Sequence, residues 1–499
     1  MTVYKEKSQG AAIQPLMSKF TKLKPEKKNK SRNIFVLIFS SIFMVLSWFT
    51  DVNKIVLENV VLKNNSQMLN WYINPPVNKI IKVHVFNYTN IEKYKSGEDK
   101  KLHVQDIGPF SFEEIADKID VKWNDEFLTY RENRSHKFLP HLSTNIPLNS
   151  TIIFPNILLI SAIPNIHRIG FAAKTAFGTL LNLSKPKQFE NLTIEESIFG
   201  FPTPFKRAVS MVKWNLSPYD TGLLMKRSGI SETAITINTG IKDYNQIGKI
   251  VKINGKNKLD IWKSESCNNV SASDGAFYGP ENLSLRKEVQ AYIPELCRSL
   301  PLKYEKFGSF QSIPVLQYNI PDDIFDKNKN CEPKNTEPQN IDGTFDASQC
   351  DFVEGSPPIF VSFPHFLHGD PKLFEHFEGL KPNKNSHKSF VHFHPRISVP
   401  IQGSLFMQLN LQLFHFRNYF KEFPEGIILP VAWIEVTIEN KIERNVWWFF
   451  FLSADFADYF INFVRILLTI VFLFASKSFY DSLKKEEENY QKEKIIRIS

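Results

Sequence analysis

The chain has 499 residues, of which 42% are hydrophobic, so it is long and apolar enough for one large domain or two or three ordinary ones. Its formal net charge of +9 is unevenly distributed, because six lysines and one arginine lie between residues 19 and 32, where Glu26 is the only acid. A basic run beside an apolar segment is typical of a membrane topology signal and argues against a nucleic-acid-binding protein.

The first apolar segment runs from Ile34 to Phe49 and contains no charged residue. At about 1.5 Å per residue it covers about 25 Å, slightly less than a bilayer core. A cleaved signal peptide is the alternative, but the residues around Trp48 offer no small-residue cleavage site. We therefore expect a cytoplasmic tail at 1–33, a transmembrane helix at 34–50 and an exported ectodomain at 51–456.

The exported region is expected to be rich in β-strands. Apolar and polar residues alternate in six segments: 79–89, 234–241, 249–262, 357–366, 388–396 and 404–416. In the first segment Ile81, Val83 and Val85 would share one buried face, and Asn254-Gly255 is a typical hairpin turn. The pattern predicts a large antiparallel sheet or barrel.

Residues 149–200 interrupt the strand pattern. Between Ile152 and Phe199 the apolar spacing is helical, and Thr193 to Glu196 fits a capping box. We expect a helical cap whose basic residues face an anionic ligand or partner; solvated basic residues at helix ends are the alternative. These residues are Arg168, Lys174, Lys185 and Lys187.

The Asn-x-Ser/Thr pattern of N-glycosylation occurs nine times between the two apolar segments, which supports export. Asn215 is a weak acceptor because Pro218 follows its triplet. The other expected acceptors are Asn64, Asn87, Asn133, Asn149, Asn182, Asn191, Asn269 and Asn282.

All four cysteines lie in the exported stretch 267–350. An even number of cysteines in an oxidising compartment predicts two disulfides, and the sequence leaves three connectivities open. A zinc site is the alternative, but the chain has no Cys-x-x-Cys pair. The cysteines are Cys267, Cys297, Cys331 and Cys350.

Six of the twelve histidines lie between residues 365 and 394, and His392 and His394 would point to one face of a strand. A zinc site is one interpretation, but no further metal-binding motif accompanies them, and we expect structural or surface histidines. The chain also has no nucleophile elbow, phosphate loop or dinucleotide fingerprint. We expect no metal, no cofactor and no catalytic residue, and hence a binding or transport protein. The cluster consists of His365, His368, His376, His387, His392 and His394.

The second apolar segment predicts a transmembrane helix at 457–477 and a cytoplasmic tail at 478–499. Five aromatic residues at 447–451 precede it, as in an interfacial belt, and Arg465 lies close enough to the outer end to snorkel. A buried core helix is the alternative. Two spans of opposite direction would place both termini in the cytoplasm.

Several motifs resemble, in order, those of the class B scavenger receptors, which include fatty-acid translocase, insect sensory neuron membrane proteins and a lysosomal integral membrane protein. Together with both apolar segments the resemblance covers residues 34–480. The motifs are Trp71, Asn74-Pro75-Pro76, Phe86-Asn87-Tyr88-Thr89-Asn90, Gly108 to Glu114, Phe199-Gly200-Phe201 with Pro204-Phe205, Cys297-Arg298-Ser299, Pro364 to Leu367, Gly379 to Asn383 and Pro430 to Glu435.

The resemblance implies an α+β membrane glycoprotein with an antiparallel β-barrel core, a helical apex bundle and an internal lipid tunnel. Such proteins bind lipids, lipoproteins or lipid-carrying proteins at the apex. They pass a fatty acid, sterol, carotenoid or pheromone through the tunnel to the membrane. The implied location is the plasma membrane, with the lysosomal membrane as an alternative, and a homo-oligomer or co-receptor is an implied partner.

Two departures from the family pattern bear on these expectations. The family has six ectodomain cysteines, and with four the order of the pairs implies Cys267 with Cys331 and Cys297 with Cys350. Ala272-Ser273-Asp274-Gly275 stands where many members have Gly-Thr-Asp-Gly.

The alternative functions are a two-span ligand-gated channel subunit, and a lysosomal sorting receptor of the same family. The bulky second span argues against a channel pore.

Overall fold

The structure is a computed structural model that describes residues 14–49, 52–75, 78–166, 170–201, 222–334, 341–350, 358–438 and 446–498. The chain divides into two units, one formed by residues 1–56 and 452–499 and the other by residues 57–451.

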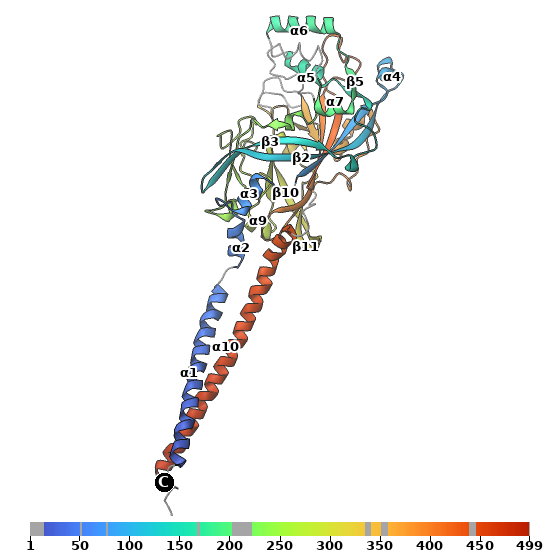
Figure 1. The fold of residues 1–499 in the computed structure, drawn as a ribbon. Coiled ribbons are helices and arrows are strands. Elements are labelled where there is room, and N and C mark those ends of the chain that lie inside the picture. Colours follow the sequence, from blue (N-terminus) through green and yellow to red (C-terminus); the bar gives the residue numbers. More distant parts are fainter. Residues whose placement is uncertain are drawn as a thin grey trace, which may run out of the picture. The chain divides into compact units, whose positions relative to one another are not determined.

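The first unit contains most of the two long helices, α1 (Gln14–Phe49) and α10 (Val446–Ile498), labelled in Figure 1. Among the described residues, the helical segment Tyr459–Ile498 is long and apolar enough to cross a bilayer, whereas the apolar helix Ile34–Phe49 is shorter. The apolar side chains of both segments are largely exposed, for example Phe39 and Phe463. These lengths do not by themselves confirm the two predicted spans.

Arg465 of α10 contacts the end of α1. Its Nε donates a hydrogen bond to the carbonyl oxygen of Ser47 at 2.9 Å, and its guanidinium lies 5.5 Å from the centre of the Trp48 ring. Ser47 lies in the last turn of α1, where carbonyl groups lack helical partners and the helix dipole is negative. The arginine is therefore bonded within the unit.

The second unit is built on a sheet of 15 strands, most of them antiparallel. The first segment of the chain that pairs in it, β1 (Lys79–Tyr88), lies between β2 (Leu102–Trp123) and β17 (Ile428–Ile438). The order of the main path is β8 (Ile250–Ile253), β7 (Ile235–Asn238), β3 (Phe127–Phe138), β2, β1, β17, β16 (Pro400–Gln412), β15 (Phe390–Phe393), β11 (Ile313–Asn319), β10 (Arg298–Phe310) and β9 (Val289–Ile293).

Four short strands pair outside this path: β12 (Phe345–Asp346) with β13 (Ile359–Ser362), β13 with β16, β14 (Phe377–Glu378) with β2, and β6 (Gly229–Ile230) with β3. The ladders do not close into a ring, because β8 and β9 are the two ends of the path, so the predicted barrel is not confirmed. Ser273 lies between these ends and forms single bridges to Lys249 and to Ala291.

The predicted strands were found, but most of them are shorter than expected. The segment 79–89 is β1, and Ile81, Val83 and Val85 are fully buried as predicted. The segment 249–262 contains only β8, because its Asn254-Gly255 turn leads into irregular structure. After β13 the segment 357–366 continues as a 3₁₀ turn.

Short helices precede and connect these strands. Ser66 caps α3 (Gln67–Ile73) by accepting a hydrogen bond from the backbone N–H of Leu69. The other short α-helices here are α2 (Val52–Val60), α4 (Ile91–Ser96) and α9 (Pro280–Ser284). The 3₁₀-helices are η1 (Pro140–Leu142), η2 (Met225–Arg227), η3 (Tyr244–Gln246), η4 (Pro294–Leu296), η5 (Lys327–Lys329), η6 (Pro364–Phe366) and η7 (Pro371–Phe374).

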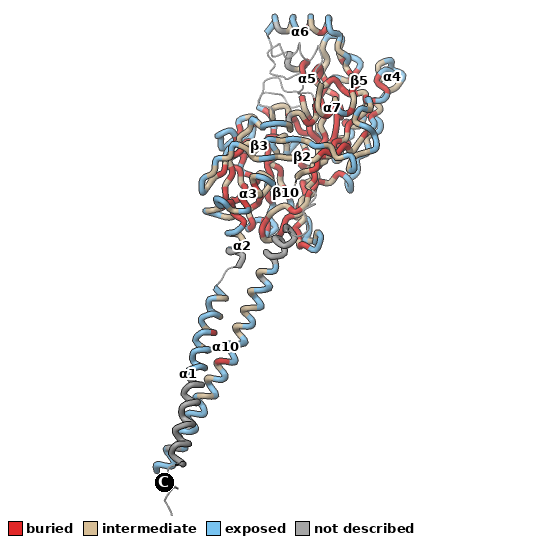
Figure 2. Tube along the Cα trace, viewed as in Figure 1, coloured by how far each residue is buried: buried red, intermediate tan, exposed pale blue. Residues whose placement is uncertain are grey.

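The predicted cap contains helices and also a two-stranded sheet (Figure 1). Its elements are β4 (Thr151–Pro155), α5 (Ile157–Ile166), α6 (Phe171–Ser184), β5 (Phe189–Thr193) and α7 (Ile194–Phe199). The capping box of Thr193 and Glu196 is confirmed, because both of its hydrogen bonds are present. Phe154, Leu159 and Phe177 pack into one core with strand residues, and Figure 2 shows buried segments both in the sheet and beneath α6.

The structure contains one disulfide, between Cys267 and Cys331, whose Cα atoms lie 5.8 Å apart. The predicted bond between Cys297 and Cys350 is absent, and both thiols are free. Cys297 Sγ contacts the backbone carbonyl oxygen of Cys350 at 3.2 Å, so the two residues are neighbours without a bond between their sulfurs.

Candidate functional site

The second unit encloses a cavity of about 380 Å³ within its sheet. Residues from ten strands of the main path line it: β1, β2, β3, β7, β8, β9, β10, β15, β16 and β17. Successive side chains of a strand point to opposite faces, so alternate residues of each strand can reach one interior space. The sheet therefore wraps around the cavity although its ladders remain open.

One wall of the cavity is apolar. Leu300 and Leu302 of β10, Leu405 and Met407 of β16 and Val436 of β17 contribute to it. Apolar residues at alternate positions are the pattern expected for strands that face an interior. Such a wall can accept a hydrocarbon chain, since burial removes about 0.8 kcal/mol of unfavourable hydration per CH₂ group.

Another part of the lining contains charged and phenolic side chains. Tyr72 of α3 and Tyr130 of β3 both donate hydrogen bonds to Asp274 Oδ2, the second at 3.2 Å. The two tyrosine rings meet edge to face, 5.8 Å apart. Burial, together with the charge of Asp274, raises the pKa of both hydroxyls, so both remain protonated donors.

A network of arginines and glutamates lies beside these tyrosines. Arg227 of η2 donates to both oxygens of Glu114, at 3.0 and 3.1 Å, and also pairs with Glu295. Burial alone would raise the pKa of the fully buried Glu114 carboxyl, but the hydrogen bonds from His136 and Arg227 hold it well below its usual range. Arg134 pairs with Glu132 and reaches Glu295 at 3.5 Å. The network therefore satisfies its own charges.

Lys118 of β2 differs from this network. Its Nζ lies 4.2 Å from the centre of the Tyr72 ring and 5.1 Å from that of Tyr130. Among the described residues no carboxylate lies within ion-pair distance of it, and burial lowers the pKa of its amine despite the attraction of Glu132 and Asp274. Its uncovered surface faces the cavity.

The sequence pattern did not predict strands β2 and β3, which contribute the charged part of the cavity lining. Glu114, Ala116 and Lys118 alternate along β2 and line the cavity, but charged residues at inward positions conceal the apolar periodicity. Tyr130, Glu132 and Arg134 do the same on β3. The one available sequence signal is that the charged residues of each strand stand two positions apart, as residues on one face of a strand do.

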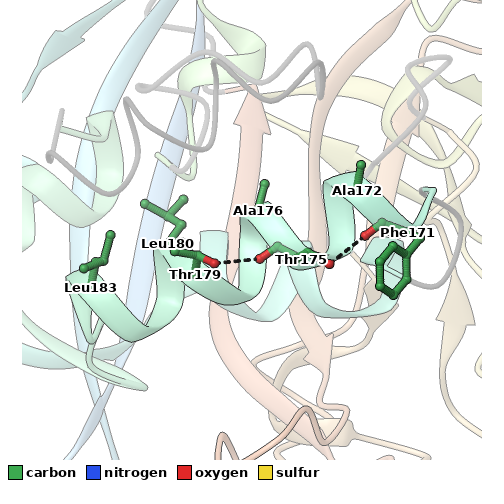
Figure 3. A pocket seen from close by; sticks show the side chains of 7 residues that line it. All are labelled: Phe171, Ala172, Thr175, Ala176, Thr179, Leu180 and Leu183. Atoms are coloured by element: carbon green, nitrogen blue, oxygen red, sulfur yellow. Dashed lines mark hydrogen bonds between the residues drawn. The ribbon is translucent and has the colours of Figure 1, made fainter.

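The apex of the unit presents a second surface. Figure 3 shows seven residues along α6 that line a shallow groove, among them Phe171 and Leu183, whose exposed fractions are 84% and 81%. The hydroxyls of Thr175 and Thr179 donate to the carbonyl oxygens of Phe171 and Thr175, each at 3.0 Å. Because these hydroxyls are already bonded, the face is effectively apolar.

The predicted basic residues of the cap surround this helix unevenly. Lys174 of α6 is half-buried, whereas Lys185, the C-cap of α6, and Lys187 are exposed. Arg168 lies outside the described residues. The structure thus places two exposed lysines just after the apolar face of α6.

The histidine cluster is mostly structural. His365 Nε2 lies 3.1 Å and His84 Nδ1 3.0 Å from the carboxylate of Asp106, to which Trp433 donates at 3.0 Å. His365 Nδ1 also accepts a backbone hydrogen bond from Lys381, at 3.2 Å. Burial by itself would raise the pKa of Asp106, but these bonds hold it well below its usual range. Asp106 therefore links these side chains as a charged acceptor.

His392 and His394 do not form a common face. β15 ends at Phe393, His392 Nε2 lies 3.4 Å from Gln317 Oε1, and the buried His394 Nδ1 accepts backbone hydrogen bonds from Arg396 and Ile397. Within the described residues no group of three or more His, Cys, Asp or Glu side chains could hold a metal ion.

Seven of the eight expected glycan acceptors are exposed in the structure. Asn87 is half-buried in β1, where its Oδ1 accepts from the backbone N–H of Ile153 at 2.8 Å. Asn215 lies outside the described residues.

The sequence of the chain is similar to those of a known protein family and of several characterised proteins. The model of the CD36 family matches residues 33–479. Scavenger receptor class B member 1 of Sus scrofa is 28% identical over 388 residues, which is 77% of this chain and 75% of that protein. The protein of the same name from Bos taurus is 28% identical over 400 residues, 79% of this chain and 77% of that protein. Lysosome membrane protein 2 of Mus musculus is 28% identical over 392 residues, 76% of this chain and 78% of that protein.

Proposed function

The chain belongs to the CD36 family, and from this premise we propose that it is a membrane-anchored receptor that binds lipids, lipoproteins or lipid-carrying proteins and passes a lipid to the membrane. Scavenger receptor class B member 1 and lysosome membrane protein 2 are its relatives. The transported lipid would be a fatty acid, sterol, carotenoid or pheromone.

The cavity inside the sheet is the observation that carries this proposal. An interior space of about 380 Å³ with an apolar wall is of the size and character of ligand sites. A lipid that moves through such a space keeps its chain out of water, which would otherwise cost about 0.8 kcal/mol per CH₂. We propose that the cavity is one part of the transfer path and that the strands around it act as a barrel.

The apex would make the first contact with the ligand. The apolar groove on α6 suits the acyl surface of a lipoprotein or lipid carrier. Lys185 and Lys187 would attract anionic ligands to the same place, with Lys174 and Arg168 as further candidates. An exposed apolar face beside cationic side chains is the arrangement that an anionic amphiphilic surface would recognise.

The two apolar helical segments would anchor the protein with both termini in the cytoplasm. The basic run before Ile34 and the lysines after the second segment support this orientation. The plasma membrane is the proposed location, and the lysosomal membrane is the second candidate because of the relative named lysosome membrane protein 2. The exposed acceptor asparagines would carry glycans on the exported side.

Lipid uptake by cells that produce the protein tests this function. We expect Leu405→Trp, which fills the cavity with a larger side chain, to reduce uptake of labelled fatty acid and sterol several-fold. Leu285→Trp is the matched control, because Leu285 is exposed and lies outside the cavity lining. Surface labelling with a membrane-impermeant reagent corrects for the amount of protein at the cell surface.

The apex is tested in the same cells with a Lys185→Glu, Lys187→Glu double variant. This variant should reduce binding of lipoprotein while leaving uptake of monomeric fatty acid closer to that of the wild type. If the wild type binds and takes up no lipid above untransfected cells, the proposed function is wrong. A ligand-gated current in patch-clamp recording would support the channel alternative instead.

A further inference from the structure

We propose that Lys118 is the anchor for the anionic head group of the lipid in the cavity, and that it selects carboxylate amphiphiles over neutral ones of the same shape. This inference rests on the proposed lipid-binding function and adds a residue and a head-group chemistry to it. The head group would lie beside the rings of Tyr72 and Tyr130, with the chain against the apolar wall.

The backbone determines the direction of this side chain. Glu114, Ala116 and Lys118 are alternate residues of β2, so they leave the same face of the strand, and all three line the cavity. The Lys118 ammonium lies over the Tyr72 ring at 4.2 Å. The rings contact the ammonium through their faces, which leaves its N–H donors available to an acceptor in the cavity.

The nearby carboxylates are engaged elsewhere. Glu132 accepts from Arg134 Nε at 2.8 Å. Asp274 accepts from the hydroxyls of Tyr72 and Tyr130 through one oxygen and from the backbone N–H of Ala276, at 3.0 Å, through the other. In the part of the chain that the structure describes, neither carboxylate forms an ion pair with the lysine.

The cavity is not a general attractor of anions, because the charges that line it balance. Four cations and four anions contribute, so an anion elsewhere in the cavity meets little net attraction. Among the described lining residues, Lys79 and Lys118 are the cations without an ion pair, and Lys118 is the one whose ammonium lies over the tyrosine rings, where a head group can reach it. The cations are Lys79, Lys118, Arg134 and Arg227, and the anions are Glu114, Glu132, Asp274 and Glu295.

A carboxylate suits this position better than a neutral or cationic group. Burial disfavours the charged amine and lowers the pKa of Lys118, and a bound anion removes that cost by forming charge-assisted hydrogen bonds. A hydroxyl or ester offers a weaker acceptor, and a cation would be repelled. The preference therefore comes from a donor that the protein itself does not satisfy.

The rest of the cavity explains why the ligand is an amphiphile and not a free anion. Leu300, Leu302, Leu405 and Met407 form an apolar lining that a small anion would leave uncovered. A hydrocarbon chain would bury this lining while its carboxylate pairs with Lys118. Head and tail are thus recognised by different walls of one cavity.

Direct binding to the full-length protein in detergent tests the inference. Dissociation constants of radiolabelled oleic acid and of its methyl ester are measured by scintillation proximity at pH 8, with acetate as a competitor. We expect the acid to bind at least about tenfold more tightly than the ester, since a charge-assisted bond adds more than about 1.4 kcal/mol. Acetate should not compete, because it lacks a chain.

In Lys118→Met the preference for the acid should disappear while the ester binds as in the wild type. Lys118→Arg, which keeps the charge, should retain part of the preference, and Lys122→Met, an exposed lysine of the same strand, should retain all of it. Equal binding of acid and ester by the wild type, or an unchanged preference in Lys118→Met, would overturn the inference alone. Absence of binding of both lipids by the wild type would overturn the proposed function as well.

Discussion

Lys118 and Glu132 face each other across the β2–β3 ladder but form no ion pair with each other. The Glu132 carboxylate bonds instead to Arg134, two residues further along the same strand. The rings of Tyr72 and Tyr130 take the place of a carboxylate next to the lysine. The strand register places Lys118 opposite Glu132, but Arg134 binds the glutamate, so the lysine has no ion pair.

Replacing Lys118 should stabilise the protein in the absence of lipid. In lipid-depleted protein, Lys118→Met should raise the free energy of unfolding by about 1–3 kcal/mol, because it removes a charge that desolvation disfavours and that no ion pair compensates. The gain should shrink as the pH rises toward about 10.4, the ordinary pKa of lysine, because the neutral amine carries no such cost. Chemical denaturation of the wild type and of Lys118→Met at several pH values measures this difference in the free energy of unfolding.

Lys122→Met is the control for this prediction and should change the free energy of unfolding by less than about 0.5 kcal/mol, because Lys122 is exposed. A lower stability of Lys118→Met than of this control would contradict the account of the unpaired ammonium.

Glu114→Gln should destabilise the unit strongly. The substitution removes the charge that pairs with Arg227 and accepts from His136, and it leaves a buried arginine with Glu295 as its remaining partner. We expect a loss of about 3 kcal/mol in the free energy of unfolding, measured by chemical denaturation. Glu126→Gln, which breaks a surface pair with Lys242, should cost less than about 1 kcal/mol. Similar losses in both variants would contradict a structural role of the buried network.

The strands show how much of the structure could be predicted from the sequence. Apolar alternation identified β1 and parts of β7, β8, β13, β15 and β16, because their buried faces are hydrophobic. It missed β9, β10, β11 and β17, and it also missed β2 and β3, whose inward residues include Glu114, Lys118, Glu132 and Arg134. The pairing that makes such residues tolerable inside a protein depends on the register between strands, which one strand does not reveal.

The cap and the cysteines show the same limit. Thr193 and Glu196 form a local motif of four residues, and their capping box was predicted correctly. The thiols of Cys297 and Cys350 are free although Cys297 Sγ contacts the carbonyl oxygen of Cys350, and nothing in the local sequence of either residue indicates this. The local motif was predictable from the sequence, whereas of the two distant cysteine pairs that the resemblance implied, Cys267–Cys331 is present and Cys297–Cys350 is absent.

Asn87→Ala should destabilise the protein more than the loss of another expected glycan acceptor. Oδ1 of Asn87 accepts from the backbone N–H of Ile153 and so joins β1 to β4. Without it we expect a loss of about 1 kcal/mol in the free energy of unfolding. Asn133→Ala removes an exposed acceptor from β3 and should have little effect. Equal effects in thermal unfolding would show that the side-chain bond contributes nothing.

Protonation of His387 should contribute to acid sensitivity. Burial and the neighbouring His365 lower the pKa of His387 to about 4, so the unfolded chain binds a proton more readily than the folded chain between about pH 6.5 and 4. The free energy of unfolding should therefore fall with decreasing pH across this window, by about 1–3 kcal/mol from this group. Denaturation of the wild type and of His387→Gln at several pH values measures the contribution as a difference. A constant difference across the window would contradict it.

The pairing of β1 with β17 has a consequence for the synthesis of the chain. The hydroxyl of Tyr88 bonds to the carbonyl oxygen of Pro430, 342 residues later, and β1 gains its second neighbouring strand only when β17 has been made. Until then β1 has an open edge that could pair with other chains, and long-range strand pairing is slow. The second unit is thus an incomplete sheet for most of its translation, which makes the nascent chain a natural client for chaperones.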